Sequence, residues 1–472
     1  MGRDMTSGNP LKLIVLFSLP MLLGNVFQQF YSMADTFIVS QTLGMDALAA
    51  VGSVGSIMFL ILGLAIGLTA GLAVITAQRF GKKDEKALRR SLGVSLIIVI
   101  AISIILTIAA TLNTRNILEL MQTPPEIIDD AYDYLVVIFA GIGATVMFNY
   151  LSNVLRAIGD SRTPLLFLIV TSILNIILDY TFILGFDMNV AGAGYATVIS
   201  QLIASVLCLI YIKKRVRILR IKKSDWTKDW AEYKEHLRIG LPYGFQYSII
   251  AIGSVAIQIT LNQSGALSVA AYTASIKIEQ LLTMPLQTMG VAMSTYVAQN
   301  FGAGEFNRIK QGIKSGMSIT LVYAASIGVI LLFFGRFLAG FFVEDGNAEV
   351  LALSERFFTI QWPFYMLLAL VLVLRPSIQG LGNSFVPTVA GILELVARII
   401  GALVLSEYFG FSGAVMSNPL AWFAATVPLV ISVYYTLKIL EKEPTKKDLM
   451  LSLGSKTVYQ QSKTLRKECA CS

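Results

Sequence analysis

The sequence predicts an all-α, polytopic membrane protein with twelve transmembrane helices arranged as two parallel lobes of six. Hydrophobic residues make up 55% of the 472 residues and charged residues only 14%, and the mean hydropathy is +0.70. No soluble core needs that much apolar surface. The apolar residues also gather in twelve runs of about 20 residues or more, the length that a helix needs to cross the roughly 30 Å hydrocarbon core of a bilayer.

Polar or charged segments separate these runs, and each run predicts one helix. The runs cover residues 11–40, 48–77, 92–112, 134–158, 164–186, 190–212, 239–261, 269–298, 313–334, 357–378, 386–406 and 413–437. Because the first run has full membrane length and follows a polar start, we expect it to stay in the mature protein rather than to be cleaved as a signal peptide.

The loops alternate sharply in charge, and this alternation predicts their orientation. The loops after the second, sixth and eighth runs are basic, with six Lys and Arg residues in 79–90, seven in 213–223 and three in 308–314. The loops after the third and ninth runs are acidic, at 119–133 and 344–349. Since basic loops stay on the cytoplasmic side, both termini should be cytoplasmic and the protein should lie in the plasma membrane.

The second half of the chain repeats the first. Residues 76–81 (TAQRFG) recur 221 residues later as 297–302 (VAQNFG), and each copy ends a predicted helix. Further matched pairs are Pro20 with Pro242, Gly159-Asp160-Ser161 with Gly382-Asn383-Ser384, and Pro164 with Pro387. Because six is an even number of spans, the two copies enter the membrane in the same sense.

The repeat divides the chain into five predicted parts. We expect a cytoplasmic N-terminus at 1–10, an N-lobe of helices 1 to 6 at 11–212, a cytoplasmic linker at 213–238, a C-lobe of helices 7 to 12 at 239–437 and a polar cytoplasmic tail at 438–472. Two such lobes around a central cleft are what alternating access by rocking requires.

The remaining composition argues against other classes of partner. The net charge is +8, but the basic residues lie in short loops, so we expect no nucleic-acid partner. Cys208 lies in an apolar run and Cys469 and Cys471 lie in the tail, so neither a disulfide framework nor a metal cluster is expected. His236 lies in a charged segment and is expected to be solvated. The predicted partners are small molecules and the bilayer, with no cofactor and a monomeric state.

Two acids inside apolar runs predict a cation site. Asp179 lies in the run 164–186, with Asn175 one turn away on the same face. Counting from the predicted outer ends, Asp35, Asp179 and Thr197 all lie about 9–10 Å deep. An acid there costs at least about 2.5–3.5 kcal/mol, which favours a functional role over simple helix packing. For Thr197 alone, packing is an equal alternative.

The chemistry of this site stays open at this point. Two carboxylates with amide and hydroxyl oxygens suit Na⁺, whereas two close carboxylates can also hold a proton. Asn149 and Asn153 lie deeper, on the fourth predicted helix.

The C-lobe carries its own charged side chains within apolar runs. These are Lys277, Glu279, Arg375, Glu394 and Arg398. Glu394 and Arg398 are one turn apart and can pair, so a structural ion-pair lattice competes with a substrate or gating role.

An adaptable surface for substrates is a further possibility. Its candidate residues are Gln28, Tyr31 and Met284, together with Phe27, Phe30, Met289 and Met293. Ordinary packing in the helix bundle explains these side chains equally well.

With these residues in view, the chain resembles the multidrug and toxic compound extrusion (MATE) family of efflux transporters over about residues 10–440. The resembling stretches are Pro20 with 33–36 (MADT), the two Ala-Gln-x-Phe-Gly helix ends, 155–160 (LRAIGD) and 174–179 (LNIILD). The family fold is twelve helices in two six-helix lobes, so the resemblance agrees with the pattern of runs.

The resemblance implies cation-coupled export, with H⁺ or Na⁺, of drug-like and often cationic or amphiphilic compounds. It places the ion site of the N-lobe, in the branch named for damage-inducible proteins, at Asp35, Asn175, Asp179 and Thr197, with Asn149 or Asn153 as a further partner. Another branch uses a carboxylate in the seventh helix, but 239–261 contains no acid here.

Two alternatives belong to other functions. A flippase for lipid-linked saccharides, from the same wider superfamily, would suit a cationic cavity near Lys277, Arg375 and Arg398. An enzyme is not expected, because the apolar runs hold no histidine and the chain has no HExxH or GxSxG motif.

Overall fold

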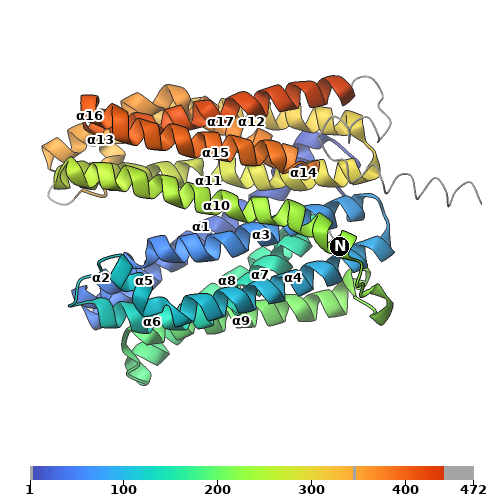
Figure 1. Cartoon of the computed structure of the whole chain (residues 1–472), viewed down its shortest axis with the longest axis horizontal. Coiled ribbons are helices and arrows are strands. Elements are labelled where there is room, and N and C mark those ends of the chain that lie inside the picture. The colour runs from blue at the N-terminus through green and yellow to red at the C-terminus, as the bar shows by residue number, and fades with distance from the viewer. Residues whose placement is uncertain (1–3, 344–346, 441–472) are drawn as a thin grey trace, which may run out of the picture. The chain divides into compact units, whose positions relative to one another are not determined.

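The computed structural model describes residues 4–343 and 347–440, and this part of the chain is almost entirely helical (Figure 1). Its residues form two compact units, and each unit has its own buried apolar core. The greater part of the predicted tail, 441–472 with Cys469 and Cys471, lies outside the described residues, as do Glu344 and Asp345.

The first unit comprises Leu19–Ala251 with Asp4. Its helices are α1 (Pro10–Leu43), α2 (Met45–Ser53), α3 (Gly55–Gly81), α4 (Glu85–Leu112), α5 (Thr114–Leu120), α6 (Ile128–Ala140), α7 (Ile142–Ala157), α8 (Arg162–Tyr180), the π-helical turn η1 (Thr181–Gly185), α9 (Asn189–Arg215), the short turns η2 (Arg217–Leu219) and η3 (Lys223–Asp225), and the first half of α10 (Trp230–Gln263).

The second unit comprises Met5–Ser18 and the described residues from Ile252 onward. It holds the rest of α10, α11 (Ala266–Ala303), α12 (Phe306–Ala339), α13 (Ala348–Gln361), η5 (Trp362–Phe364), α14 (Tyr365–Gly380), α15 (Phe385–Ile400), the π-helical turn η6 (Gly401–Leu405), α16 (Ser406–Phe409) and α17 (Phe411–Leu440). Helices α1 and α10 each contribute to both units, and each contains one proline of the predicted pair, Pro20 and Pro242.

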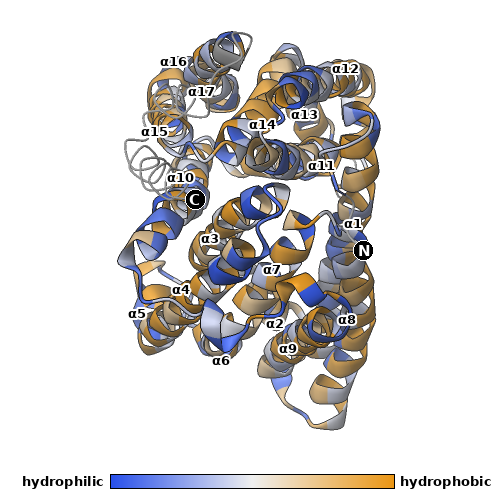
Figure 2. Ribbon diagram, turned by 90° about the vertical axis from the view of Figure 1, so that its right-hand side faces the viewer, coloured by the Kyte–Doolittle hydropathy of each residue, from blue (hydrophilic) through white to orange (hydrophobic). Residues whose placement is uncertain are grey.

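The membrane-spanning character of the helices follows from their length and from their largely apolar residues, which are orange in Figure 2. Within the described residues, ten helical segments are long and apolar enough to cross a bilayer, and the bent pair α6–α7, with a 48° break, makes an eleventh. The one remaining predicted span, 269–298, lies in α11. This helix has 38 residues but carries Lys277 and Glu279 and is therefore less apolar. Large apolar side chains such as Ile105 and Phe333 lie exposed on these helices, as expected for surfaces that face lipid.

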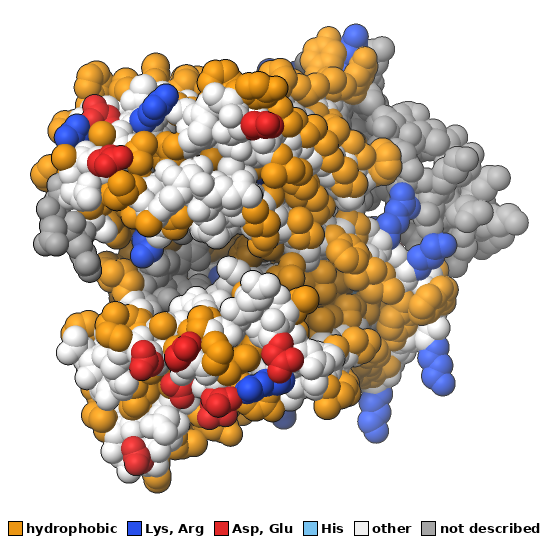
Figure 3. Space-filling view, turned by 60° about the vertical axis from the view of Figure 1, so that its left-hand side comes forward, with side chains coloured by type: hydrophobic (Ala, Val, Ile, Leu, Met, Phe, Trp, Pro, Cys, Tyr) orange, Lys and Arg blue, Asp and Glu red, His pale blue; other side chains and the backbone are white. Residues whose placement is uncertain are grey.

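Each of the twelve predicted runs falls within one of these spans to within a residue at its end, so the predicted fold class is confirmed. The predicted lobe and linker boundaries stay a prediction. The contacts of the chain group residues 213–238 with the first unit. At the end of this unit where α5 and α6 lie, acidic side chains gather on the surface (Figure 3).

Candidate functional site

The first unit brings together the two acids that the sequence singles out. Asp35 lies on α1 and Asp179 on the last turn of α8, just before the π-helical turn η1. Their carboxylates are close enough to share a hydrogen bond if one of them carries a proton, and to repel each other if both are ionised. Asp179 is fully buried. The geometry therefore concentrates negative charge at one buried point.

These carboxylates have few compensating partners. Among the described residues, no donor reaches either oxygen of Asp179 or Oδ1 of Asp35. Asn175, one turn earlier on α8 and 1% exposed, also has both its amide oxygen and its amide nitrogen unpaired. Buried polar groups in proteins are nearly always paired. A cluster of unpaired carboxylate and amide oxygens fits a bound cation or a shared proton.

Two tyrosines and a threonine surround the acids. Tyr31 on α1 and Tyr134 on α6 both lie within electrostatic range of Asp35 and Asp179. A narrow recess next to Asn175 is lined by Tyr31, Thr197 and other residues of α8 and α9. The structure thus brings Asp35 close to Asp179, with Asn175 one turn earlier on α8, and places Thr197 on the recess that Asn175 lines.

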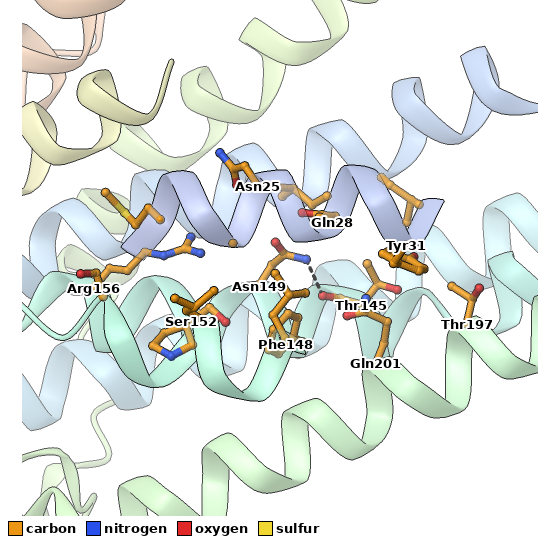
Figure 4. Close-up of a pocket in the computed structure, with 18 of the residues that line it drawn as sticks. Asn25, Gln28, Tyr31, Thr145, Phe148, Asn149, Ser152, Arg156, Thr197 and Gln201 are labelled. Carbon is orange, nitrogen blue, oxygen red and sulfur yellow. Dashed lines mark hydrogen bonds between the residues drawn. The ribbon is translucent and has the colours of Figure 1, made fainter. Parts of the chain in front are cut away.

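A larger cavity of about 260 Å³ opens beside this recess, within the first unit (Figure 4). Helices α1, α3, α6, α7, α8 and α9 all contribute to its wall. Its polar lining comprises Asn25, Gln28, Tyr31, Thr145, Asn149, Ser152, Arg156, Ser161, Thr197 and Gln201. Its volume is slightly below the range of about 300–1,000 Å³ for small-molecule sites. The cavity can therefore hold a compact ligand.

The two candidate asparagines of α7 have different surroundings. Asn149 lines the cavity, and its Nδ2 donates to the carbonyl of Thr145 at 2.8 Å (Figure 4). Asn153 does not line it; its Nδ2 donates to Oγ1 of Thr69 at 3.0 Å, and its Oδ1 accepts from Nη1 of Arg156 at 3.2 Å. Asn149 is the one whose side chain meets the cavity.

Several polar residues of the cavity were not singled out from the sequence. Arg156, Ser152 and Gln201 face it, and Tyr134 lies next to the acids. A signal did exist for α7, because Asn149, Ser152 and Arg156 are spaced three and four residues apart and so share one helix face.

In the second unit, the predicted charged residues form a buried ion cluster. Glu394 accepts from Nη2 of Arg375 at 2.5 Å and from Nη2 of Arg398 at 3.0 Å. Glu279 is also buried, and the hydroxyl of Tyr365 donates to it at a longer 3.5 Å. Lys277 is exposed on α11 and does not belong to this cluster.

The methionine and phenylalanine candidates do not line the cavity. Met289 and Met293 are buried in the second unit, where Met293 lies against Gly316. Met284 is half-buried, while Phe27 and Phe30 are exposed on α1. Of the predicted adaptable surface, Gln28 and Tyr31 are the members that meet the cavity.

The expectation of a solvated His236 is wrong. Its side chain is fully buried, with one ring nitrogen 2.8 Å from Oγ of Ser91 and the other 2.7 Å from the carbonyl of Glu232. The sequence predicts a linker at 213–238, whereas α10 begins at Trp230. The nine residues 230–238 form about two and a half helical turns, which direct His236 against α4.

Comparisons with known proteins come from sequence and from structure. The MatE family profile matches residues 20–181 and again 242–404, two segments whose starts are 222 residues apart. The chain is 30% identical over 413 residues to "Probable multidrug resistance protein YpnP" of Bacillus subtilis, with 87% of this chain and 92% of that protein covered. It is 28% identical over 431 residues to "Probable multidrug resistance protein YoeA" of the same organism, with 89% and 92% covered.

The fold is also found among solved structures. One, described as the "Outward-facing conformation of a multidrug resistance MATE family transporter of the MOP superfamily", has a TM-score of 0.85 and 24% identity, with 93% of this chain and 99% of that chain covered. These comparisons give no support to the flippase alternative.

Proposed function

The chain belongs to the MatE family of multidrug transporters, and we propose that it exports drug-like, amphiphilic compounds in exchange for a cation. One observation carries the exchange part of this proposal. The half-buried Asp35 and the buried Asp179 lie close together, and no donor reaches Oδ1 of Asp35 or either oxygen of Asp179 among the described residues, so a cation or a proton would relieve their repulsion.

Helix α1 links the ion to the compound. It carries Asp35 at the acid pair and also Gln28 and Tyr31 on the cavity wall. When the carboxylates repel each other, α1 is pushed away from α8, and when a cation neutralises them, the two helices can close. Ion binding then changes the shape of the cavity. Such coupling requires that ion and compound favour different conformations, because a ligand with equal affinity for both shifts nothing.

Both coupling ions fit the residues present. Asp35, Asp179 and the amide oxygen of Asn175 offer hard oxygen ligands for Na⁺, whereas one proton held between the carboxylates would serve H⁺ coupling. These side chains support export rather than catalysis, because they can bind an ion but include no nucleophile in contact with a base.

The test uses purified protein in proteoliposomes and a fluorescent cationic dye, with pH and Na⁺ gradients imposed separately. Asp35→Asn and Asp179→Asn should each lower gradient-driven transport by about 100-fold, since ion binding no longer distinguishes the conformations. The matched control is Asp187→Asn, an exposed acid just beyond η1, which should transport like the parent protein. Undiminished transport by both site variants would contradict the proposal.

The two gradients decide the ion. If only the pH gradient drives transport, the carboxylates hold a proton, and if only the Na⁺ gradient does, they bind the metal ion. Dye movement driven by neither gradient in the parent protein would refute exchange.

A further inference from the structure

A half-buried arginine lies at the end of the cavity opposite the acid pair. Arg156 is in the last turn of α7, and its guanidinium points into the cavity (Figure 4). Tyr31 and Thr197 mark the other end, and Tyr31 lies within electrostatic range of Asp35 and Asp179. From Thr145 to Arg156, helix α7 rises about 16 Å. The cavity therefore has an acidic end and a basic end.

Arg156 has no carboxylate partner within the described part of the chain. Its one hydrogen bond to a side chain goes from Nη1 to the neutral Oδ1 of Asn153 at 3.2 Å, and its buried Nε has no acceptor. The nearby Asp160 is already used, because its carboxylate caps α8 through the backbone N–H groups of Arg162 and Thr163.

Four other arginines of the described residues, half-buried or buried, pair with carboxylates. Arg79 contacts Glu232 at 2.6 Å, and Arg89 contacts Asp225 at 3.0 Å. In the second unit, Arg375 and Arg398 share Glu394. An arginine turned into the interior of a membrane protein without a carboxylate partner commonly marks a site that handles charge. Arg156 differs from these four arginines, because no carboxylate of the described residues pairs with it.

The surroundings of Arg156 suit an oxyanion on an apolar body. Ser152 lies one turn earlier on the same face of α7 and lines the cavity, and its buried Oγ has no partner other than the nearby thiol of Cys208. Ser161 lines the same end. Next to these donors, the wall is apolar, with Met21 and Leu165. A guanidinium binds a carboxylate through two parallel hydrogen bonds, which a lysine cannot reproduce.

We infer that Arg156 and Ser152 form an oxyanion subsite, so that the cavity selects amphiphiles bearing a carboxylate. This inference rests on the proposed function and deepens it, because it names a chemical class among the transported compounds. A compound with a cationic group as well can place it toward Asp35 and Asp179 while its carboxylate meets Arg156.

The test compares two dyes that differ only in this charge: a rhodamine with a free carboxylate and its methyl ester. Equilibrium binding to the full-length protein in lipid nanodiscs is measured by fluorescence anisotropy, without any gradient. Arg156→Gln should raise the Kd of the acid at least about tenfold and leave the Kd of the ester nearly unchanged, since a hydrogen bond to a charged group is lost. For Arg156→Lys, the Kd of the acid should lie between the values for the parent protein and for Arg156→Gln.

Controls separate recognition from folding. Arg162→Gln removes an exposed arginine six residues away and should bind both dyes like the parent protein. If Arg156→Gln does not fold, the two dyes are compared on Ser152→Val, which keeps the guanidinium. This variant should weaken the binding of the acid and leave that of the ester unchanged. An equal loss of both dyes, or no loss of either, would overturn the subsite.

Failure of the proposed function has a different signature. In proteoliposomes, a parent protein that moves neither dye under any gradient would refute export, whatever the anisotropy shows. A parent protein that transports both dyes, with Arg156→Gln affecting them equally, would refute the subsite alone.

Discussion

Helices α8 and α15 are equivalent in the two repeats, but the buried acid of α8 lacks a partner whereas the buried charges of α15 are paired. Each is followed by a five-residue π-helical turn, Thr181–Gly185 after α8 and Gly401–Leu405 after α15. Each is preceded by a glycine at positive φ, 85° at Gly159 and 84° at Gly382, a conformation that an L-residue rarely adopts. The backbone of the repeat is thus preserved at both ends of this helix.

The buried faces between these ends differ. On α8 the face carries Asn175 and Asp179, whose polar atoms lack partners within the described residues. On α15 it carries Glu394 and Arg398, which pair with each other and with Arg375. One copy leaves its charge available to a ligand, and the other neutralises its charge internally. The comparison teaches that the same scaffold can carry a binding site or a structural cluster, depending on whether the partner side chain is present.

The largest effect that would test this contrast is expected from Glu394→Gln. This change leaves Arg375 and Arg398 buried without their shared carboxylate, and removing one partner of a buried ion pair costs about 3–5 kcal/mol. The free energy of unfolding, measured in mixed micelles, should fall by this amount.

Asp179→Asn is the matched change in the other repeat. It removes a buried charge that has no partner, so the free energy of unfolding should stay the same or rise. If the two variants lose equal stability, the distinction between an available and a neutralised charge is wrong.

The ends of α3 and α11 allow a second, smaller test. In the first unit, Arg79 pairs with Glu232 at 2.6 Å and with Glu235 at 3.2 Å. At the equivalent position of the second unit, Asn300 donates to the carbonyl of Met5 at 3.1 Å and accepts from Nε of Arg308 at 3.0 Å. Only the first of these two contacts is an ion pair.

Glu232→Gln should therefore destabilise the protein by about 2 kcal/mol. The loss should be smaller at high salt, because screening already weakens the ion pair that this change removes. Asn300→Ala should cost about 1 kcal/mol at any salt concentration. Unfolding is followed at low and high ionic strength. A loss for Asn300→Ala that shrinks with salt, or one for Glu232→Gln that does not, would show that the two helix ends are held alike.

The sequence was sufficient to predict that Asp35 and Asp179 meet, although they are 144 residues apart. A bilayer fixes where each helix begins and ends, so counting residues from the predicted ends gives a depth for each polar side chain. Two acids at one depth in one lobe are then expected to lie close together. The repeated motifs predicted the paired helices for the same reason, because each copy must cross the same thickness.

The direction of a side chain around its helix was harder to predict. In a helix that is apolar on all sides, hydrophobic periodicity does not separate the lipid face from the interior. The sequence therefore identifies Arg156 as part of a motif but does not predict that it lines the cavity. His236 was misplaced because the start of α10 lies within a charged segment, where no apolar pattern marks the first turn.

The smallest effect concerns the first turn of α8 and α15, where the two copies should respond alike. Oδ1 of Asp160 accepts from the N–H of Thr163 at 3.0 Å, and Oδ1 of Asn383 accepts from the N–H of Phe385 at 3.0 Å. Loss of such a cap costs about 1 kcal/mol.

Asp160→Ala and Asn383→Ala should each lower the free energy of unfolding in micelles by about 1 kcal/mol, whereas Asp160→Asn should cost less because an amide oxygen can also cap the helix. Since Asp160 also accepts from the hydroxyl of Thr163, its alanine variant should be slightly the more damaging. A much larger loss at only one of the two turns would mean that the repeats share a backbone path without sharing what stabilises it.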